Sequence, residues 1–281
     1  MKDIEYFDKL WQDSKPKDGM VHNKETWDRK AKNWKSDSKE TRERKIRQVD
    51  ALIDFLLKNA VLESSFDVLD LGCGSGKYAV KMAEYVKSVT CSDISPIMLE
   101  YCKENAKEAG LKNIRFQEAD FLTQSVLELQ WEKKFDFVFT SLTPAVDSLK
   151  SIEKIEQITR KWAFNSSFVY LKDSLKDEIC INVFEKELVS SWGNSSPYSI
   201  WNILWHKGRF PKIDYYEDES EEKYELSLET AEQIAESIIR DRDPNEEEIN
   251  RVYKYLEKRY GNAPFVRKTE AMYAWILWQI D

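Results

Sequence analysis

The stretch "DVLDLGCGSGKYAV" (residues 67–80) places three of the chain's eight glycines, Gly72, Gly74 and Gly76, within five residues. An apolar run precedes these glycines, and a helical pattern follows them. A buried strand that leads into a glycine loop and then a helix leaves backbone N–H groups pointing outward and lets a ligand approach the main chain closely. The spacing G-x-G-x-G differs from the G-x-G-x-x-G of dinucleotide binders. The stretch predicts a ligand-binding corner, and a simple turn is the alternative.

Strands and helices alternate on either side of this corner. The expected strands are residues 66–71, 88–93, 114–120, 135–142 and 166–173, and the expected helices are 40–60, 78–86, 95–110 and 148–163. The helix at 95–110 has Ser95 at its N-cap, Pro96 at its first position and Gly110 after its end. This alternation predicts an α/β fold with a doubly wound, mostly parallel sheet.

The pattern changes after residue 175. Residues 176–211 are helical and rich in aromatic side chains, and we expect an insertion that caps the carboxyl edge of the sheet. "KIDYYEDE" (212–219) is consistent with a strand, helices are expected at 227–239 and 245–261, and the apolar "MYAWILWQI" (272–280) is expected to return to the sheet as a strand. The predicted segments are an N-terminal helical lid (1–45), a ligand-binding core (46–175), the cap (176–211) and the C-terminal part of the core sheet (212–281).

The composition limits the classes of partner. The net charge is −8, which argues against a nucleic-acid partner or an anionic membrane surface. No apolar run is long enough to span a membrane, and the polar start does not resemble a signal peptide, so we expect a cytoplasmic protein. We expect it to be a monomer or a homodimer. The chain has four cysteines without a C-x-x-C pair and only two histidines. We therefore expect reduced thiols and no metal site.

Two carboxylates follow the next two strands. Asp93 ends the strand at 88–93, about 20 residues after the glycines, where a carboxylate can accept hydrogen bonds from the hydroxyls of a ribose. The alternative is an N-cap for the following helix, but Ser95 already fills that position. In "EADF" (118–121), Asp120 can accept a hydrogen bond from an exocyclic amine and Phe121 can cover an aromatic ring. A polar turn is the alternative there.

"VLDLGCGSG", Asp93, "EADF" and "FDFVFTSL" occur in an order that resembles the class I S-adenosylmethionine-dependent methyltransferases. The resemblance covers residues 66–173 and implies a seven-stranded sheet whose last strand is antiparallel. It also implies S-adenosyl-L-methionine as cofactor and S-adenosyl-L-homocysteine as product. The glycine loop would then wrap the amino acid end of the cofactor, Asp93 would hold the ribose, and Asp120 would meet the adenine amine. The implied cofactor-binding residues are Trp27, Trp34, Asp70, Gly72, Cys73, Gly74, Gly76, Asp93, Ile94, Met98, Ala119, Asp120, Phe121, Ser141 and Leu142.

Trp27 and Trp34 belong to "TWDRKAKNW" (26–34), which resembles the aromatic segment that closes over the cofactor in small-molecule members of the family. The two rings are one helical repeat apart and share one face, so plain packing against the sheet is the alternative.

The resemblance implies methyl transfer to a small-molecule acceptor. The asparagine-proline-proline-aromatic motif, with which members of the family methylate planar nitrogens, is absent, and "SLTPAV" stands in its place. Its absence argues against the methylation of amide or DNA-base nitrogens. A general base is needed only if the acceptor must lose a proton. His206 and Tyr198 are candidates, as are His22 and Asp147, but no spacing singles one out.

The aromatic side chains of the predicted cap suit a flat, apolar or cationic acceptor, or they pack the insertion onto the sheet. They are Phe184, Trp192, Tyr198, Trp201 and Trp205. A non-catalytic protein that binds S-adenosylmethionine and a nicotinamide-dependent oxidoreductase remain the alternative functions.

Overall fold

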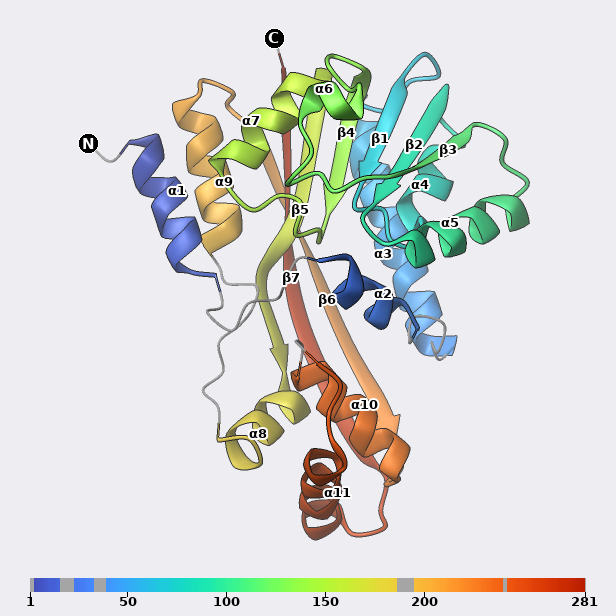
Figure 1. Cartoon of the computed structure of the whole chain (residues 1–281), viewed down its shortest axis with the longest axis vertical. Coiled ribbons are helices and arrows are strands. Elements are labelled where there is room, and N and C mark those ends of the chain that lie inside the picture. The colour runs from blue at the N-terminus through green and yellow to red at the C-terminus, as the bar shows by residue number, and fades with distance from the viewer. Residues whose placement is uncertain (1–2, 16–22, 33–38, 186–194, 240–241, 281) are drawn as a thin grey trace.

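The computed structural model describes residues 3–15, 23–32, 39–185, 195–239 and 242–280, which form a seven-stranded sheet with helices on both faces (Figure 1). The strands are β1 (Asp67–Leu71), β2 (Ser88–Asp93), β3 (Ile114–Glu118), β4 (Phe135–Ser141), β5 (Thr159–Asp173), β6 (Lys212–Tyr224) and β7 (Phe265–Gln279). Their order is β3-β2-β1-β4-β5-β7-β6, and β7 runs antiparallel to both of its neighbours. The predicted fold class is confirmed, including the late antiparallel strand.

The helices largely follow the sequence pattern. They are α1 (Ile4–Asp13), α2 (Lys24–Lys32), α3 (Lys39–Lys58), α4 (Lys77–Met82), α5 (Pro96–Glu108), α6 (Val126–Leu129), α7 (Leu149–Ile158), α8 (Ser174–Asn182), α9 (Ser195–His206), α10 (Leu228–Ile238) and α11 (Glu246–Tyr260). The expected helix at 148–163 is wrong beyond residue 158. From Thr159 the chain pairs with β4, with Phe164 beside Phe139, because side chains that suit a half-buried pleated surface favour the sheet there.

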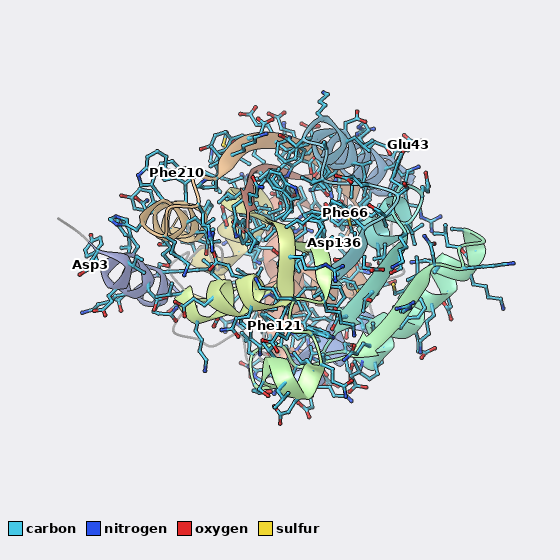
Figure 2. The ribbon with its side chains drawn as sticks, turned by 90° about the horizontal axis from the view of Figure 1, so that it is seen from above. Asp3, Glu43, Phe66, Phe121, Asp136 and Phe210 are labelled. Atoms are coloured by element: carbon cyan, nitrogen blue, oxygen red, sulfur yellow. The ribbon has the colours of Figure 1, made fainter. Side chains whose placement is uncertain are left out.

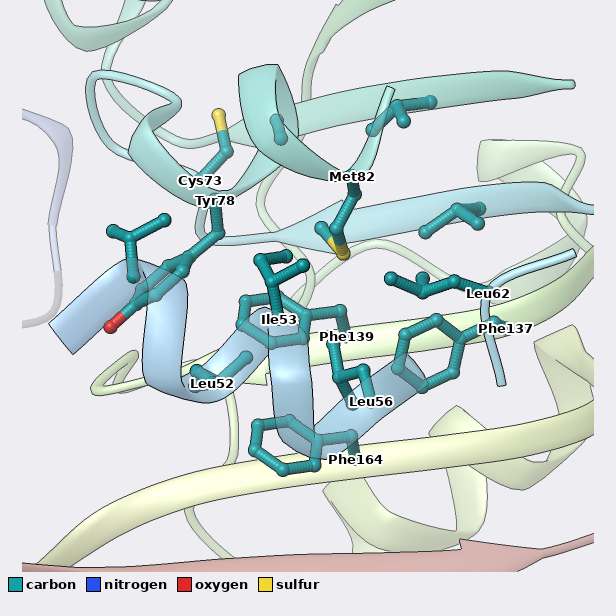
Figure 3. Packing of buried hydrophobic residues seen from close by; sticks show 14 of the residues in the cluster. Leu52, Ile53, Leu56, Leu62, Cys73, Tyr78, Met82, Phe137, Phe139 and Phe164 are labelled. Atoms are coloured by element: carbon teal, nitrogen blue, oxygen red, sulfur yellow. The ribbon is translucent and has the colours of Figure 1, made fainter. Parts of the chain in front are cut away.

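Apolar side chains fill both faces of the sheet. On one face, α3 and α4 bring Leu56 and Met82 against Phe139 and Phe164, whose rings stack 5.1 Å apart (Figure 3). On the other face, Val138 packs among buried side chains of α7 and α9. Phe139 and Val138 face opposite ways because successive side chains of a strand alternate. Viewed from above, the labelled residues Glu43 of α3 and Phe121 lie on opposite sides of the sheet (Figure 2).

The last three strands continue beyond the others. β5 pairs with β4 only as far as Ser166, and its residues 167–173 continue beside β7 and then into α8. We call the far ends of β5, β6 and β7, together with α8, α10 and α11, the extension (Figure 1). The extension has its own buried cluster, which includes Ile179, Ala235 and Leu256. Asp173 caps α8 and pairs with Arg267 at 2.5 Å, so this end of the molecule is held by its own contacts.

The described part of the predicted cap (residues 176–211) does not cover the carboxyl edge of the sheet. α8 belongs to the extension, whereas α9 packs with α1 against β5 and β7 on one face of the sheet. The buried side chains of α9 include the aliphatic Ile200, Ile203 and Leu204, and Trp201 is partly buried beside them, whereas Tyr198 and Trp205 are exposed. Trp192 lies outside the described residues. Within the described ranges, no helix is both long and apolar enough to cross a membrane.

Candidate functional site

The glycines of the loop after β1 have three different environments. Gly72 has φ +73°, and a Cβ there would stand 2.1 Å from Oγ1 of Thr143. Gly76 has φ +80°, and its Cβ would stand 2.3 Å from Sγ of Cys102 on α5. Gly74 has φ +53° and faces open space. The outer two glycines therefore allow close packing against the β4 loop and α5, whereas the middle one leaves room for a ligand.

A cavity of about 600 Å³ opens beside this loop. Its walls come from the loops that follow β1, β2, β3 and β4, from α2, and from the first half of α3. Nearly all of the residues implied by the resemblance line it, namely Trp27, Asp70, Gly72, Cys73, Gly74, Asp93, Ile94, Met98, Ala119, Asp120, Phe121, Ser141 and Leu142. Ligands of doubly wound sheets bind at this carboxyl edge.

Asp93 is fixed by the backbone on both sides. One carboxylate oxygen accepts from the N–H of Gly74 at 2.9 Å, and the other accepts from the N–H of Ser95 at 2.9 Å. Ser95 itself caps α5, because its Oγ accepts from the N–H of Met98 at 3.2 Å. Each carboxylate oxygen has lone pairs left for further donors. Asp93 thus joins the glycine loop to β2 and presents an acceptor to the cavity.

Asp70, near the end of β1, is almost fully buried. Its Oδ2 has no hydrogen-bond partner among the described residues. Burial raises the pKa of this carboxyl well above its usual value, because the charged form loses water. A buried acceptor without a partner is rare, and it fits a donor group that arrives with a ligand.

Asp120 has a structural role as well as a place in the cavity wall. Its Oδ1 accepts from the N–H groups of Leu122 at 3.1 Å and Thr123 at 3.3 Å, so it forms the polar turn that the sequence left open. The next residue, Phe121, is buried and stacks on Trp131. The turn holds both side chains at the cavity.

Helix α2 is attached to the rim of the cavity by two side-chain contacts. Ser95 Oγ donates to Asp28 Oδ1 at 2.5 Å, and Lys24 pairs with Glu118 at 2.6 Å. These contacts place Trp27 at the cavity, as predicted. Trp34 and His22 lie outside the described residues.

One wall of the cavity is basic, which the sequence analysis did not predict. Arg42 and Lys45 of α3 and Lys77 of α4 line the cavity, and Lys77 donates to Gln48 Oε1 at 3.2 Å. Burial, and then the charge of Lys45, lower the pKa of Lys77 to about 8. The position of Lys77 directly after the glycine motif was the available signal. Nothing in the sequence showed that the start of α3 returns to the same place.

Several predicted site residues lie away from the cavity. Gly76 does not line it, because this glycine packs against α5. His206 and Tyr198 of α9 are exposed, and their rings lie 5.5 and 5.9 Å from the ring of Phe7 on α1. No described residue of 176–211 lines the cavity. Asp147 is not in the lining either and pairs with Lys15 at 2.8 Å.

A comparison with protein families decides the class. The model of a methyltransferase domain matches residues 62–226, which include the glycine loop and all the acidic cavity residues named above. The chain belongs to this methyltransferase family. The resemblance drawn from the sequence is therefore confirmed.

Curated relatives match this methyltransferase over short stretches. A 23S rRNA (uracil(1939)-C(5))-methyltransferase RlmD from Psychromonas ingrahamii is 33% identical over 84 residues, which are 30% of this chain and 19% of that protein. A ubiquinone biosynthesis O-methyltransferase from Rickettsia felis is 29% identical over 94 residues, which are 34% of each protein. The chain thus spans about a third or less of the length of such relatives.

The solved structure of YcgJ from Bacillus subtilis has 16% sequence identity and a TM-score of 0.47, and the alignment covers 81% of this chain and 97% of that one. The family assignment rests on the domain match.

Proposed function

We propose that this methyltransferase transfers a methyl group from S-adenosyl-L-methionine to a small-molecule acceptor. The observation that carries the proposal is the placement of Asp70, Asp93 and Asp120 at the ends of three neighbouring strands, β1, β2 and β3, around one cavity. The cofactor offers a matching series of groups, which are an ammonium, a ribose diol and an adenine amine.

The described residues fit this cofactor. The unpartnered, buried oxygen of Asp70 suits an ammonium group, which would also stabilise the charged carboxylate. Asp93 suits the two ribose hydroxyls, and Asp120 with Phe121 suits the adenine. The open side of Gly74 admits the amino acid chain, and the basic wall suits its carboxylate.

The bound cofactor would supply an electrophilic methyl group. The chain's contribution is then to orient the acceptor and to exclude water. Ser141, Leu142 and Thr143 form the loop after β4 at the cavity, where they can position an acceptor. Trp27 can cover the opening from α2. Among the described residues of the cavity, Lys77 and the carboxylates could give acid–base help to the acceptor.

A cavity of about 600 Å³ lies within the usual range of roughly 300–1,000 Å³ for small-molecule sites. The net charge of −8 disfavours nucleic acid, although several of the curated relatives are RNA methyltransferases, which match over short stretches. The volume suits a small-molecule cofactor, and the charge supports a small acceptor.

The proposal is tested in two steps on the full chain. Calorimetric titration with S-adenosylhomocysteine should give saturable binding in the micromolar range or tighter, whereas NADH should not bind. Methyl-labelled S-adenosylmethionine is then incubated with the protein and either a small-molecule cell extract or total rRNA. Label in the small-molecule fraction supports the proposal. Binding of NADH alone contradicts the cofactor, label only in rRNA contradicts the acceptor class, and binding without transfer to either supports the regulatory alternative.

A further inference from the structure

Three cysteines that are distant in the sequence meet behind the glycine loop. Cys73 lies in the loop, Cys91 lies on β2, and Cys102 lies on α5. Their sulfur atoms are all within 4.8 Å of one another, and all three residues are buried and free. Figure 3 shows the sulfur of Cys73 turned away from α3. We call these residues the thiol cluster.

The loop and helices are closely packed around the thiol cluster. The Cys102 sulfur occupies the space that a Cβ at Gly76 would need, so the first turn of α4 lies directly on it. Asp70 pairs in register with Cys91 on the neighbouring strand, so the two side chains share one face of the sheet. Asp70 also carries the buried carboxylate oxygen that has no partner among the described residues.

We propose that the thiol cluster is a binding site for a thiophilic divalent ion of the Zn²⁺ class, with Cys73, Cys91 and Cys102 as its sulfur ligands. Thiolate ligands select such ions over Mg²⁺ or Ca²⁺. For a metal–sulfur distance of about 2.3 Å, three sulfurs around one ion stand about 4 Å apart, so the cluster needs only a small contraction. Asp70 is not one of the proposed ligands, because its carboxylate does not lie within 4.8 Å of all three sulfurs.

An entry path is present. Cys73 lines the cavity, whereas Cys91 and Cys102 lie behind it. An ion would therefore reach the cluster through the cavity, past Gly74. The site could not be found from the sequence, because the spacings of 18 and 11 residues between the three cysteines match no zinc motif and only the fold brings them together.

The test is a titration of the reduced, metal-free full chain with Co²⁺, which reports sulfur coordination by its absorption spectrum, followed by displacement with Zn²⁺. The wild type should bind one equivalent with strong sulfur-to-metal absorption, and Zn²⁺ should raise its melting temperature. Cys91→Ala should weaken binding at least 100-fold. Cys180→Ala, which removes the buried cysteine of the extension, should leave it unchanged.

Circular dichroism verifies that each variant is folded. If Cys91→Ala does not fold, Cys102→Ser replaces it and is expected to lose binding equally. The proposal is overturned if the folded wild type shows no sulfur-to-metal absorption, or if a folded cluster variant binds as tightly as the wild type. It is also overturned if Cys180→Ala abolishes binding. Because no step uses S-adenosylmethionine, this result is separable from the outcome for the proposed function.

Discussion

The strands of the sheet end in two different ways, at the carboxyl ends of β1 to β4 and at the far ends of β5 to β7. β1 to β4 are short and end in loops whose polar groups face a cavity. β5, β6 and β7 have 15, 13 and 15 residues, and their far ends contribute Phe265 and Tyr224 to the apolar cluster of the extension. The first region leaves contacts open for a ligand, and the second satisfies its contacts internally.

This difference indicates where function should be sensitive to change. In the cavity region, Asp70 has an oxygen without a partner among the described residues, and Gly74 faces open space. In the extension, the buried carboxylate of Asp173 is paired with Arg267. A substitution in the extension should therefore change stability alone, whereas one at the cavity should change ligand affinity.

The largest expected effects come from core truncations in the two regions. Phe139→Ala removes a fully buried ring beneath the cavity and should cost about 3–5 kcal/mol of unfolding free energy. Leu256→Ala, in the extension, should cost about 2–5 kcal/mol. Urea unfolding measures these costs, and calorimetry measures the affinity for S-adenosylhomocysteine.

Phe139→Ala should weaken that affinity, whereas Leu256→Ala should leave it within twofold of the wild type. Hydrogen exchange should show faster opening of α10 and α11 in Leu256→Ala while β1 to β4 stay protected. A tenfold loss of affinity in folded Leu256→Ala would mean that the two regions are coupled.

A pair of glycine variants isolates the packing of the loop. Gly72→Ala introduces a Cβ that would stand 2.1 Å from Thr143 Oγ1, and we expect it to cost about 2–4 kcal/mol. Gly110→Ala has a similar φ of +69° but an open surrounding, so it should cost only about 1–2 kcal/mol. Thermal and urea unfolding measure both variants. Equal costs would show that the approach to Thr143 is not what requires glycine.

The cavity region could be predicted because its signals are local. The glycines follow a strand directly, Asp93 ends a strand and Asp120 lies two residues beyond one, and parallel strands bring such positions to one edge. The capping of α5 by Ser95 was likewise visible in the sequence. The roles of these residues in cofactor binding remain predictions, which the substitutions test.

The rest depends on contacts between distant segments. The length of β5 is set by pairing with β7 about 100 residues later. The sequence pattern predicted strands at 166–173 and 272–280, and both strands begin earlier in the structure, at Thr159 and Phe265. The aromatic residues of α9 suggested a cap, but Phe7 of α1 and the face of the sheet bury that helix instead. The basic wall likewise depends on where α3 lies relative to the glycine loop, which no local pattern reports.

A further effect on stability concerns Lys77. Burial lowers the pKa of Lys77 from 10.5 to about 8 in the folded state. Above pH 10.5 the amine is neutral in both states and costs no stability, and the protein loses stability as the pH falls from 10.5 to about 8. Lys77→Met should therefore stabilise the protein at pH 7 by about 1–3 kcal/mol and flatten the dependence of stability on pH between 8 and 10.5.

Melting curves from pH 7 to 10.5 measure this effect, with Lys107→Met, on the last turn of α5, as the matched control. If Lys77 binds the cofactor's carboxylate, Lys77→Met should also weaken cofactor affinity by about tenfold. A variant that is no more stable than the wild type at pH 7 would show that burial does not disfavour the charged form of the Lys77 amine.

The most direct test of the central claim is the affinity of S-adenosylhomocysteine for Asp93→Ala, measured by calorimetry beside Asp214→Ala, an exposed position on β6. Loss of two hydrogen bonds to a carboxylate should weaken binding by about 100-fold in Asp93→Ala, and Asp214→Ala should match the wild type. Circular dichroism shows whether each variant is folded. Wild-type affinity in a folded Asp93→Ala variant would contradict the assignment of this cavity to the cofactor.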